Sequence, residues 1–370
     1  MIHQDGDAGA LPPGLDRRLR ALYPGCRVRS ARQLGTGETK AEGETTKGLG
    51  YGRPIFVALA LPDGAERRLV FHTAGPDDFG HDRRSDRVAE LLLAWDTFGL
   101  VPGHVRALDV GVLEADGALV SLASAGEGYL VTEWAEGTLY AADLRRIAER
   151  GQATAEDLAR AERLARVLVA LHRLPGTHEG AYVRAWRDTV GSGEGIAGMV
   201  DGYPADTPGA PPARLAALER ACLEARQRHK GKTSRLRRTH GDFHPFNLLF
   251  DARGEPVLLD TSRGSEGEPA DDVACLAINY LFFGVEHRAR WEGGLGRLWE
   301  RFFEVYLAES GDAQLLELLP AFFAWRGLVV ASPRWYPNLA APDRERILGF
   351  VERALAAERF EPSFGVEAMR

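Results

Sequence analysis

The chain has 370 residues, 45% apolar and 27% charged, which is the composition of a soluble globular protein able to bury a sizeable core. Its three cysteines lie far apart in the sequence and lack the spacing of metal ligands. Because they are few and odd in number, they favour a reducing, cytoplasmic location. The net charge of −7 argues against nucleic acid as a main partner, and the lack of a long apolar stretch argues against a membrane-spanning helix.

The first part of the chain, residues 1–133, is predicted to form a small β-rich lobe with one helix. Residues 1–20 mix glycine, proline and charge and predict a flexible tail that runs into a short helix. Residues 35–53 are rich in glycine and polar side chains and predict a flexible loop. Helical spacing of apolar residues predicts a helix over residues 85–98. Strands are expected at residues 55–61, 68–73, 107–113, 118–122 and 129–134.

The remainder, residues 134–370, is predicted to form a larger helical lobe. Thr154 and Asp157 fit a capping box that opens an amphipathic helix. A short β-rich patch interrupts the helices at residues 248–260, where a turn at 252–254 separates two apolar runs. Helices are expected at residues 158–171 and 213–229 and through most of 273–360. This order predicts an α+β, bilobal protein-kinase-like fold, with a small antiparallel-sheet N-lobe and a larger helical C-lobe.

Three polar residues around the β-rich patch have the chemistry of phosphoryl transfer. That reaction needs a group that orients the attacking hydroxyl and oxygen ligands that hold Mg²⁺ against the phosphates. Asp242 can serve the hydroxyl, while Asn247 and Asp260 can bind the metal. Each of them alone could equally be a turn or strand-end residue. Together, with an apolar strand between Asn247 and Asp260, they favour a kinase site.

Two motifs resemble those of the aminoglycoside phosphotransferase and choline kinase-like family. His-Gly-Asp at 240–242, followed by Asn247, is similar to the HGDxxxxN catalytic loop of that family. Residues 267–274 are similar to its GDPxxDLA box, with Glu268 in place of the usual aspartate. The resemblance implies a kinase-like fold, and it implies that Asp272 braces the catalytic loop.

The same resemblance implies roles for individual site residues. Asp242 would be the catalytic base, and Asn247 and Asp260 would bind Mg²⁺ together with ATP as the phosphate donor. The backbone of Glu133 and Ala135 would meet the adenine, so residues 1–133 would form the nucleotide-binding lobe and residues 134–370 would hold the catalytic loop and the substrate pocket.

One feature departs from the kinase pattern. Kinases carry a lysine on the third strand that binds the ATP phosphates, but here that position fits His72. The chain has only four lysines, and none follows the loop at 35–53 until Lys230. Imidazole is shorter than a lysine side chain and only partly charged at neutral pH. His72, a nearby arginine or a lysine of that loop could bind the phosphates, and Asp86 or Glu90 could supply the carboxylate partner.

The predicted function is an ATP- and Mg²⁺-dependent O-phosphotransferase that acts on a hydroxyl of a small molecule, such as an aminoglycoside, an amino alcohol or a sugar. The missing lysine keeps open the alternative of a catalytically impaired pseudokinase that binds nucleotide or ligand. A protein kinase is disfavoured, because only six residues separate Asp260 from the box at 267–274. ATP or GTP as donor and the oligomeric state stay open, and no nucleic acid or membrane partner is expected.

Smaller expectations concern charges and aromatic residues near the site. Glu266, Glu268 and Asp271 lie close together in the sequence and predict a negative pocket for a cationic acceptor, or else helix caps. The basic stretch at 227–238 is interpreted as a solvated loop or helix end. His240 and His244 are expected to fix the loop by hydrogen bonds. The pairs Trp325-Arg326 and Trp335-Tyr336 could face a substrate, or their aromatic side chains could pack in the core.

Overall fold

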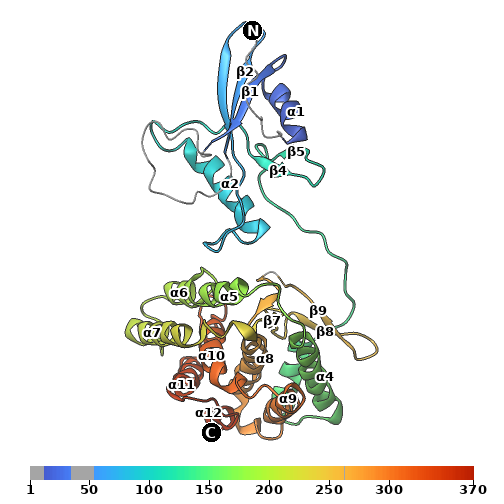
Figure 1. The fold of residues 1–370 in the computed structure, drawn as a ribbon. Coiled ribbons are helices and arrows are strands. Elements are labelled where there is room, and N and C mark those ends of the chain that lie inside the picture. The colour runs from blue at the N-terminus through green and yellow to red at the C-terminus, as the bar shows by residue number, and fades with distance from the viewer. Residues whose placement is uncertain (1–11, 35–53, 262) are drawn as a thin grey trace. The chain divides into compact units, whose positions relative to one another are not determined.

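The protein is represented by a computed structural model that describes residues 12–34, 54–261 and 263–370 (Figure 1). The chain divides into two compact units, Met1–Thr132 and Glu133–Arg370. The loop predicted at 35–53, with its two lysines, and the first eleven residues of the predicted tail lie outside the described residues. In the described ranges, no helix combines the length and apolar content needed to cross a bilayer.

The first unit is organised around a three-stranded antiparallel sheet with the strand order β1-β2-β3. The central strand has the apolar sequence IFVALA, and its buried side chains pack with helix α1, whose first residue is a proline. The small core consists of Leu15, Leu19, Cys26, Val57 and Leu59. The elements are α1 (Pro13–Leu22), β1 (Arg27–Gln33), β2 (Ile55–Ala60) and β3 (Glu66–Phe71).

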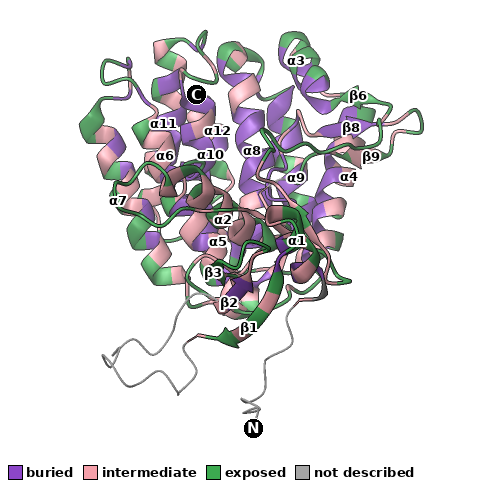
Figure 2. Ribbon diagram, turned by 90° about the horizontal axis from the view of Figure 1, so that it is seen from above, coloured by how far each residue is buried: buried purple, intermediate pink, exposed green. Residues whose placement is uncertain are grey.

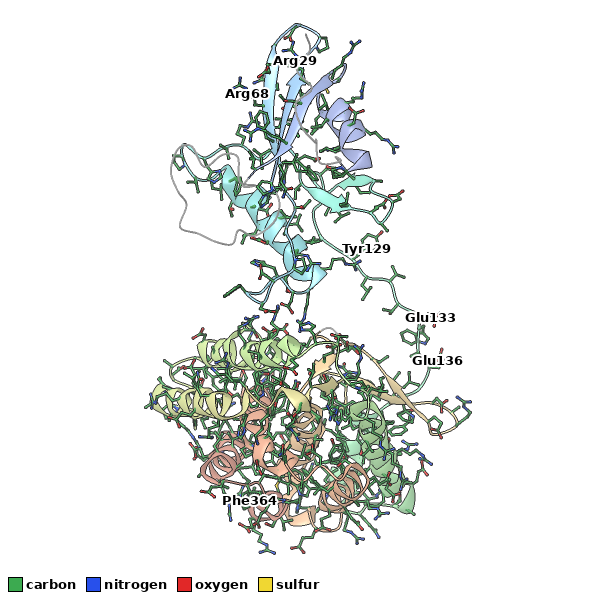
Figure 3. All side chains as sticks on the ribbon, viewed as in Figure 1. Arg29, Arg68, Tyr129, Glu133, Glu136 and Phe364 are labelled. Atoms are coloured by element: carbon green, nitrogen blue, oxygen red, sulfur yellow. The ribbon has the colours of Figure 1, made fainter. Side chains whose placement is uncertain are left out.

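The rest of the first unit contains a helix and a short hairpin, α2 (Arg84–Phe98), β4 (Gly111–Leu113) and β5 (Leu119–Ser121). The strand predicted at 129–134 is wrong, because this segment forms no ladder with any strand of the described residues. Its apolar side chains suggested a strand, yet Tyr129 is 92% exposed and Trp134 is 84% exposed. The Trp134 indole N–H donates to Glu136 at 2.8 Å. Figure 3 labels Tyr129, Glu133 and Glu136 along this segment.

The second unit is predominantly helical and contains the large hydrophobic core (Figure 2). Helices α8 and α10 are buried on almost all sides, since α10 packs against α8, α11 and α7, while α8 also packs against α9. The capping box predicted for Thr154 and Asp157 is confirmed at the start of α4. The helices are α3 (Tyr140–Arg150), α4 (Ala155–His172), α5 (Gly180–Gly191), α6 (Ile196–Asp201), α7 (Pro212–His229), η1 (Thr233–Arg235), α8 (Pro269–Gly284), η2 (Val285–Arg290), α9 (Leu295–Ser310), α10 (Leu315–Ala331), α11 (Ala341–Ala356) and α12 (Ser363–Ala368).

Two small antiparallel sheets of the second unit position the segments on which the site was predicted. The first sheet has the order β6-β8-β9 and the second pairs β7 with β10. The loop at 239–247 joins β7 to β8, and the loop at 259–265 joins β9 to β10. Both loops therefore connect the same two sheets and lie side by side. The strands are β6 (Thr138–Leu139), β7 (Arg237–Arg238), β8 (Leu248–Phe250), β9 (Pro256–Leu258) and β10 (Glu266–Gly267).

Candidate active site

The loop at 239–247 is held at its start by Asp272 of α8. The Asp272 carboxylate accepts hydrogen bonds from the backbone N–H groups of His240 at 2.7 Å and Gly241 at 2.9 Å. Burial alone would raise the pKa of Asp272, but the hydrogen bond and charge of His172 and the two N–H groups lower that pKa below its usual range. The carboxylate is therefore ionised and fixes the backbone next to Asp242.

His172, the last residue of α4, contacts the carboxylate of Asp272. Its Nε2 lies 3.1 Å from Oδ2 of Asp272, and its Nδ1 lies 2.7 Å from the hydroxyl of Tyr306. All three side chains are buried. Sequence reasoning missed this support, and the only signal for it was a histidine directly after the apolar stripe of the helix predicted at 158–171.

Gly241 allows the two loops to approach closely. Its φ is +79°, and a Cβ atom at this position would lie 2.8 Å from the carbonyl oxygen of Gly264 in the neighbouring loop. The left-handed backbone and the close approach both favour glycine. The loop that carries Asp242 therefore packs directly on the loop that follows Asp260.

Asp242 has two carboxylate oxygens with different surroundings. Oδ1 accepts a hydrogen bond from Nη1 of Arg326 at 2.8 Å. Oδ2 lies 3.5 Å from Nε2 of His244 and 3.9 Å from Nε of Arg263. Burial would raise the pKa of Asp242, but the His244 hydrogen bond and the charges of Arg326 and Arg263 hold that pKa well below its usual range. The side chain is ionised at neutral pH, and Oδ2 is the oxygen not bound by Arg326.

Arg326 of α10 is a buried cation that connects three parts of the site. Besides Oδ1 of Asp242, it donates to the carbonyl oxygen of Gly241 at 2.7 Å and, through Nε and Nη2, to Oδ1 of Asp271 at 2.8 and 2.7 Å. Its guanidinium lies 3.9 Å from the ring centroid of Trp325, which is only 5% exposed. The tryptophan is thus a core residue, whereas the arginine next to it belongs to the site.

Asp271 has Arg326 on one side and the carboxylate of Asp272 as its neighbour in the chain. Burial raises the pKa of Asp271 to about 7, with Arg326 opposing the shift and the charge of neighbouring Asp272 adding to it. One guanidinium is shared by Asp242 and Asp271, so the two carboxylates compete for the same positive charge.

Asn247 and Asp260 lie at the same end of the β8–β9 pair. The backbone N–H of Leu259 donates to the carbonyl oxygen of Asn247 at 2.9 Å, which puts Asn247 beside the residue before Asp260. The Asn247 side-chain Nδ2 donates to the backbone oxygen of Asp242 at 3.1 Å, so its amide is oriented by the catalytic loop. Asp260 is exposed and has a φ of 51°, the only positive φ of a non-glycine residue in the described chain. Such strained residues cluster at functional sites.

The two histidines of the loop act as expected. Nδ1 of His240 accepts from the backbone N–H of Asp242 at 3.3 Å, and Nδ1 of His244 accepts from the N–H of Phe246 at 3.2 Å. The prediction that both histidines fix the loop by hydrogen bonds is confirmed.

Arg263 is a site residue that the sequence did not reveal. It lies in the loop at 259–265, and its guanidinium is 5.3 Å from the ring centroid of Trp325. Its Nε lies 3.3 Å from a carboxylate oxygen of Glu194, in addition to the 3.9 Å distance to Asp242. Its Nη1 is buried and has no hydrogen-bond partner within the described part of the chain. This nitrogen is an available N–H donor next to the candidate base.

The acidic residues after Asp260 do not form the negative pocket that the sequence predicted. Glu266 pairs with Arg238 at 3.1 Å, and Glu268 pairs with Arg235 at 2.5 Å. Asp271 pairs with Arg326, as described above. The negative pocket is not supported, because each carboxylate has an arginine partner from a distant part of the sequence. The alternative, a helix cap, is confirmed at Glu268, which caps α8.

Glu268 and Arg235 instead form a structural pair. The Glu268 side chain is 2% exposed, accepts from the Tyr182 hydroxyl at 2.7 Å and caps α8 through the N–H of Ala270 at 3.3 Å. Arg235 also binds Asp312 at 2.7 Å. The interpretation of residues 227–238 as a solvated stretch is therefore wrong at Arg235. Glu268, which stands where the family motif has an aspartate, uses its longer side chain to pair with this arginine.

The predicted nucleotide-binding residues lie apart from this cluster in the chain. His72 follows the end of β3 directly and is exposed, and it belongs to the first unit. Glu133 is exposed and Ala135 half-buried, both in a segment without regular secondary structure. Of the two candidate carboxylates on α2, Asp86 accepts from the backbone N–H of Arg83, and Glu90 lies 3.3 Å from His81. The structure thus brings together Asp242 and Asn247 beside the segment that ends in Asp260.

Comparison with protein families gives one match, to a family model described as the phosphotransferase enzyme family, APH. The match covers residues 64–310, more than half of the chain. It includes the loops at 239–247 and 259–265 and the start of α8. No curated protein sequence is matched by the chain.

The chain also matches solved structures of other proteins at low sequence identity. A glucosamine kinase in complex with glucosamine, ADP and inorganic phosphate is 18% identical with a TM-score of 0.40, and the match covers 58% of this chain and 60% of that chain, less than two thirds of its length. An aminoglycoside phosphotransferase from Streptomyces rimosus is 20% identical with a TM-score of 0.31, covering 81% of this chain and 89% of that one. A choline kinase from Streptococcus pneumoniae is 14% identical with a TM-score of 0.31, covering 96% and 94%.

Proposed function

The chain belongs to the phosphotransferase enzyme family and is a small-molecule kinase, and on that premise we propose that it transfers the γ-phosphoryl group of ATP, with Mg²⁺, to a hydroxyl group of its acceptor. The family match confirms the resemblance, the kinase-like α+β fold class and the enzyme class predicted from the sequence. The observation that carries the proposal is the geometry of the Asp242 carboxylate, whose Oδ1 accepts from Arg326 while Oδ2 has no hydrogen bond from that arginine.

The proposed reaction is an in-line displacement at the γ-phosphorus. The acceptor oxygen forms a bond to phosphorus, the bond between this phosphorus and the β,γ-bridging oxygen breaks, and ADP leaves. Oδ2 of Asp242 accepts the hydrogen bond of the acceptor hydroxyl and takes its proton. Since the pKa of Asp242 is low, its main contribution is to orient the hydroxyl, which agrees with a loose transition state that needs little base strength.

The residues at the end of the β8–β9 pair fit a Mg²⁺ ion. Asn247 and Asp260 offer an amide oxygen and a carboxylate oxygen, the hard ligands that this ion prefers, and leave the other positions to phosphate oxygens and water. The ion would neutralise charge on the phosphates. The buried N–H of Arg263, which has no partner in the described part of the chain, also fits an anionic group in this region.

For the nucleotide we propose His72 as a phosphate contact and the backbone of Glu133 and Ala135 as the adenine contact. The acceptor is proposed to be an amino sugar, an amino alcohol or a sugar. Because the acidic residues near the site are paired with arginines, no strong preference for a cationic acceptor is expected.

The test is Mg²⁺-dependent release of ADP over a panel of aminoglycosides, amino sugars, amino alcohols and neutral sugars, with mass spectrometry of the product. Turnover that adds one phosphoryl group to an acceptor supports the proposal, and Asp260→Ala should then abolish Mg²⁺-dependent nucleotide binding. The absence of a lysine at the position of His72 favours a second candidate, a pseudokinase. Tight binding of Mg-ATP without turnover on any acceptor would support that candidate instead.

A further inference from the structure

Arg263 has a buried hydrogen-bond donor that finds no partner among the described residues. A guanidinium carries five N–H donors in a planar fork, and buried donors nearly always have an acceptor. Leaving one unpaired is unfavourable, because the donor loses its hydrogen bonds to water without replacing them. Nη1 of Arg263 is buried and unpartnered among the described residues, although the side chain as a whole is 26% exposed. A donor in this situation is suited to an acceptor atom of a ligand.

The position of Arg263 identifies which ligand atoms it can reach. Oδ1 of Asp242 is bound by Arg326, so Oδ2 is the oxygen that meets the acceptor hydroxyl. Nε of Arg263 lies 3.9 Å from that same Oδ2. Along the chain, Arg263 follows Asp260 by three residues, which limits their separation to about 10 Å. The guanidinium therefore lies beside the oxygen that meets the acceptor hydroxyl, and the transferred phosphoryl group must come close to this oxygen because it bonds to the oxygen of that hydroxyl.

The surroundings of Arg263 hold its guanidinium in place without neutralising it fully. The Trp325 ring, 5.3 Å from the guanidinium, provides a cation–π contact that restricts its orientation. Its other carboxylate neighbour, Glu194, has a side chain that is 73% exposed, and ion pairs with exposed groups contribute little. Arg326, in contrast, is already bound to two carboxylates. Of the two arginines beside Asp242 in the described chain, Arg263 is thus the one with a buried N–H donor left for a ligand.

The chemistry of the reaction requires such a group. In phosphoryl transfer, negative charge spreads over the three equatorial oxygens of the transferred group, and an arginine fork matches these oxygens well. The strand position that carries a positively charged lysine in other kinases fits His72 in this sequence. We propose that Arg263 is a catalytic residue that donates Nη1–H to a non-bridging oxygen of the transferred phosphoryl group. This inference rests on the proposed function and deepens it.

A transition-state analogue separates this role from a structural one. The affinity for Mg-ADP alone and for Mg-ADP with aluminium fluoride is measured for the parent, Arg263→Gln and Arg263→Lys. If Nη1 contacts the transferred group, Arg263→Gln should weaken binding of the aluminium fluoride complex by about 10²-fold, as for loss of one transition-state donor, with unchanged affinity for Mg-ADP. Arg263→Lys should recover part of this loss. Arg297→Gln, an exposed arginine on α9, is the matched control and should change neither affinity.

The outcomes distinguish this inference from the proposed function. A parent protein that fails to bind Mg-ADP contradicts the proposed function itself. A parent that binds the analogue, with equal binding by Arg263→Gln, overturns the inference and leaves the function standing. Once an acceptor is known, a rise in its KM at constant kcat in Arg263→Gln would assign Arg263 to acceptor binding and also overturn the inference. A fall in kcat of about 10²-fold, at nearly constant KM, would support it.

Discussion

At the scale of single residues, the site depends on the positively charged side chains that surround the negative carboxylate of Asp242. Two arginines and a histidine surround one carboxylate, and only one of the arginines makes a hydrogen bond to it. This arrangement keeps the carboxylate ionised and leaves Oδ2 without a hydrogen bond from either arginine, as the proposed role toward the acceptor hydroxyl requires. The energetic cost of burying the charge is offset by the paired cations.

The simplest test of this arrangement is Asp242→Asn, which keeps the size of the side chain and removes its charge. Turnover should fall by about 10²-fold or more, the usual effect of losing a general base. Affinity for Mg-ADP should stay close to that of the parent. The measurements are kcat on the best acceptor and calorimetric titration of Mg-ADP. Unchanged turnover would remove Asp242 from the mechanism.

The low pKa of Asp242 predicts a pH profile. In the parent, the Asp242 carboxylate stays ionised above its depressed pKa. Protonation of Asp242 should therefore lower kcat/KM only well below pH 4. In Arg326→Gln, one of the positive charges that lower the pKa of Asp242 is lost, while burial still raises this pKa. The pKa of Asp242 should therefore rise, and the acid limb of kcat/KM should move to higher pH. Steady-state rates between pH 4 and 8 measure this shift, with circular dichroism to confirm folding.

Arg334→Gln is the matched control for this experiment, since Arg334 is an exposed arginine a few residues beyond α10. Its acid limb should coincide with that of the parent. Coincident profiles for Arg326→Gln and the parent would show that Arg326 does not set the ionisation of Asp242.

At the scale of elements, the site is built from two adjacent loops that connect the same two sheets. The β8–β9 pair holds one end of each loop, and the β7–β10 pair holds the other. Asp272 of α8 then fixes the first loop through two backbone N–H groups. Since both loops are held at both ends, the distances between Asp242, Asn247 and Arg263 are fixed by backbone pairing as well as by side chains.

Gly241→Ala tests the contact between these loops. The new Cβ would lie 2.8 Å from the Gly264 carbonyl oxygen, so the loops must separate. Gly254→Ala is a matched control, because Gly254 has a φ of +78°, nearly that of Gly241, but a Cβ there meets its nearest atom, the end of the Glu156 side chain, at an ordinary 3.7 Å. Both variants should lose about 1 kcal/mol of stability from the left-handed backbone.

Only Gly241→Ala should also lose turnover, by up to about 10²-fold, because a displacement near 1 Å is enough to misalign reacting groups. Urea unfolding and kcat of the two variants give the comparison. Equal kcat values for Gly241→Ala and Gly254→Ala would show that the spacing of the loops does not matter for catalysis.

At the scale of the whole molecule, one buried carboxylate links stability to pH. Burial raises the pKa of Asp271 to about 7, above its value in the unfolded chain. Between about pH 4 and 7 the folded protein therefore keeps a proton that the unfolded chain loses, and stability falls as pH rises, by at most about 1.4 kcal/mol per pH unit. In Asp271→Asn this part of the slope should vanish. The free energy of unfolding in urea at pH 5 to 8 measures both slopes, and parallel curves would contradict the assignment.

The general arrangement of the molecule could be predicted from local patterns. The apolar runs, the capping box and the spacing of the site motifs depend on residues close together in the sequence, and these led to the helical second unit and to Asp242, Asn247 and Asp260. Strand β1 was missed because its sequence, RVRSARQ, has no apolar alternation and becomes a strand only by pairing with β2. Residues 129–134 have the composition of a strand but no pairing partner among the described strands.

The supporting residues of the site could not be predicted in the same way. Arg326 binds Asp242 across 84 residues of sequence, and His172 binds Asp272 across 100. Such contacts follow from helix packing, and no local pattern marks them. The acidic residues near the site were misjudged for the same reason, because their arginine partners are up to 55 residues away.

The exposed side chain of Trp134 can serve as an intrinsic fluorescent probe of nucleotide binding. Among the seven tryptophans, Trp186, Trp291, Trp299 and Trp325 are buried, whereas Trp134 is 84% exposed and lies between the two residues proposed to meet the adenine. Its fluorescence should be red-shifted and accessible to acrylamide. Arrival of a purine beside Glu133 and Ala135 should shield or quench this emission, and Trp134→Phe should abolish the response. A titration with ADP in a fluorimeter would thus report nucleotide binding without any label.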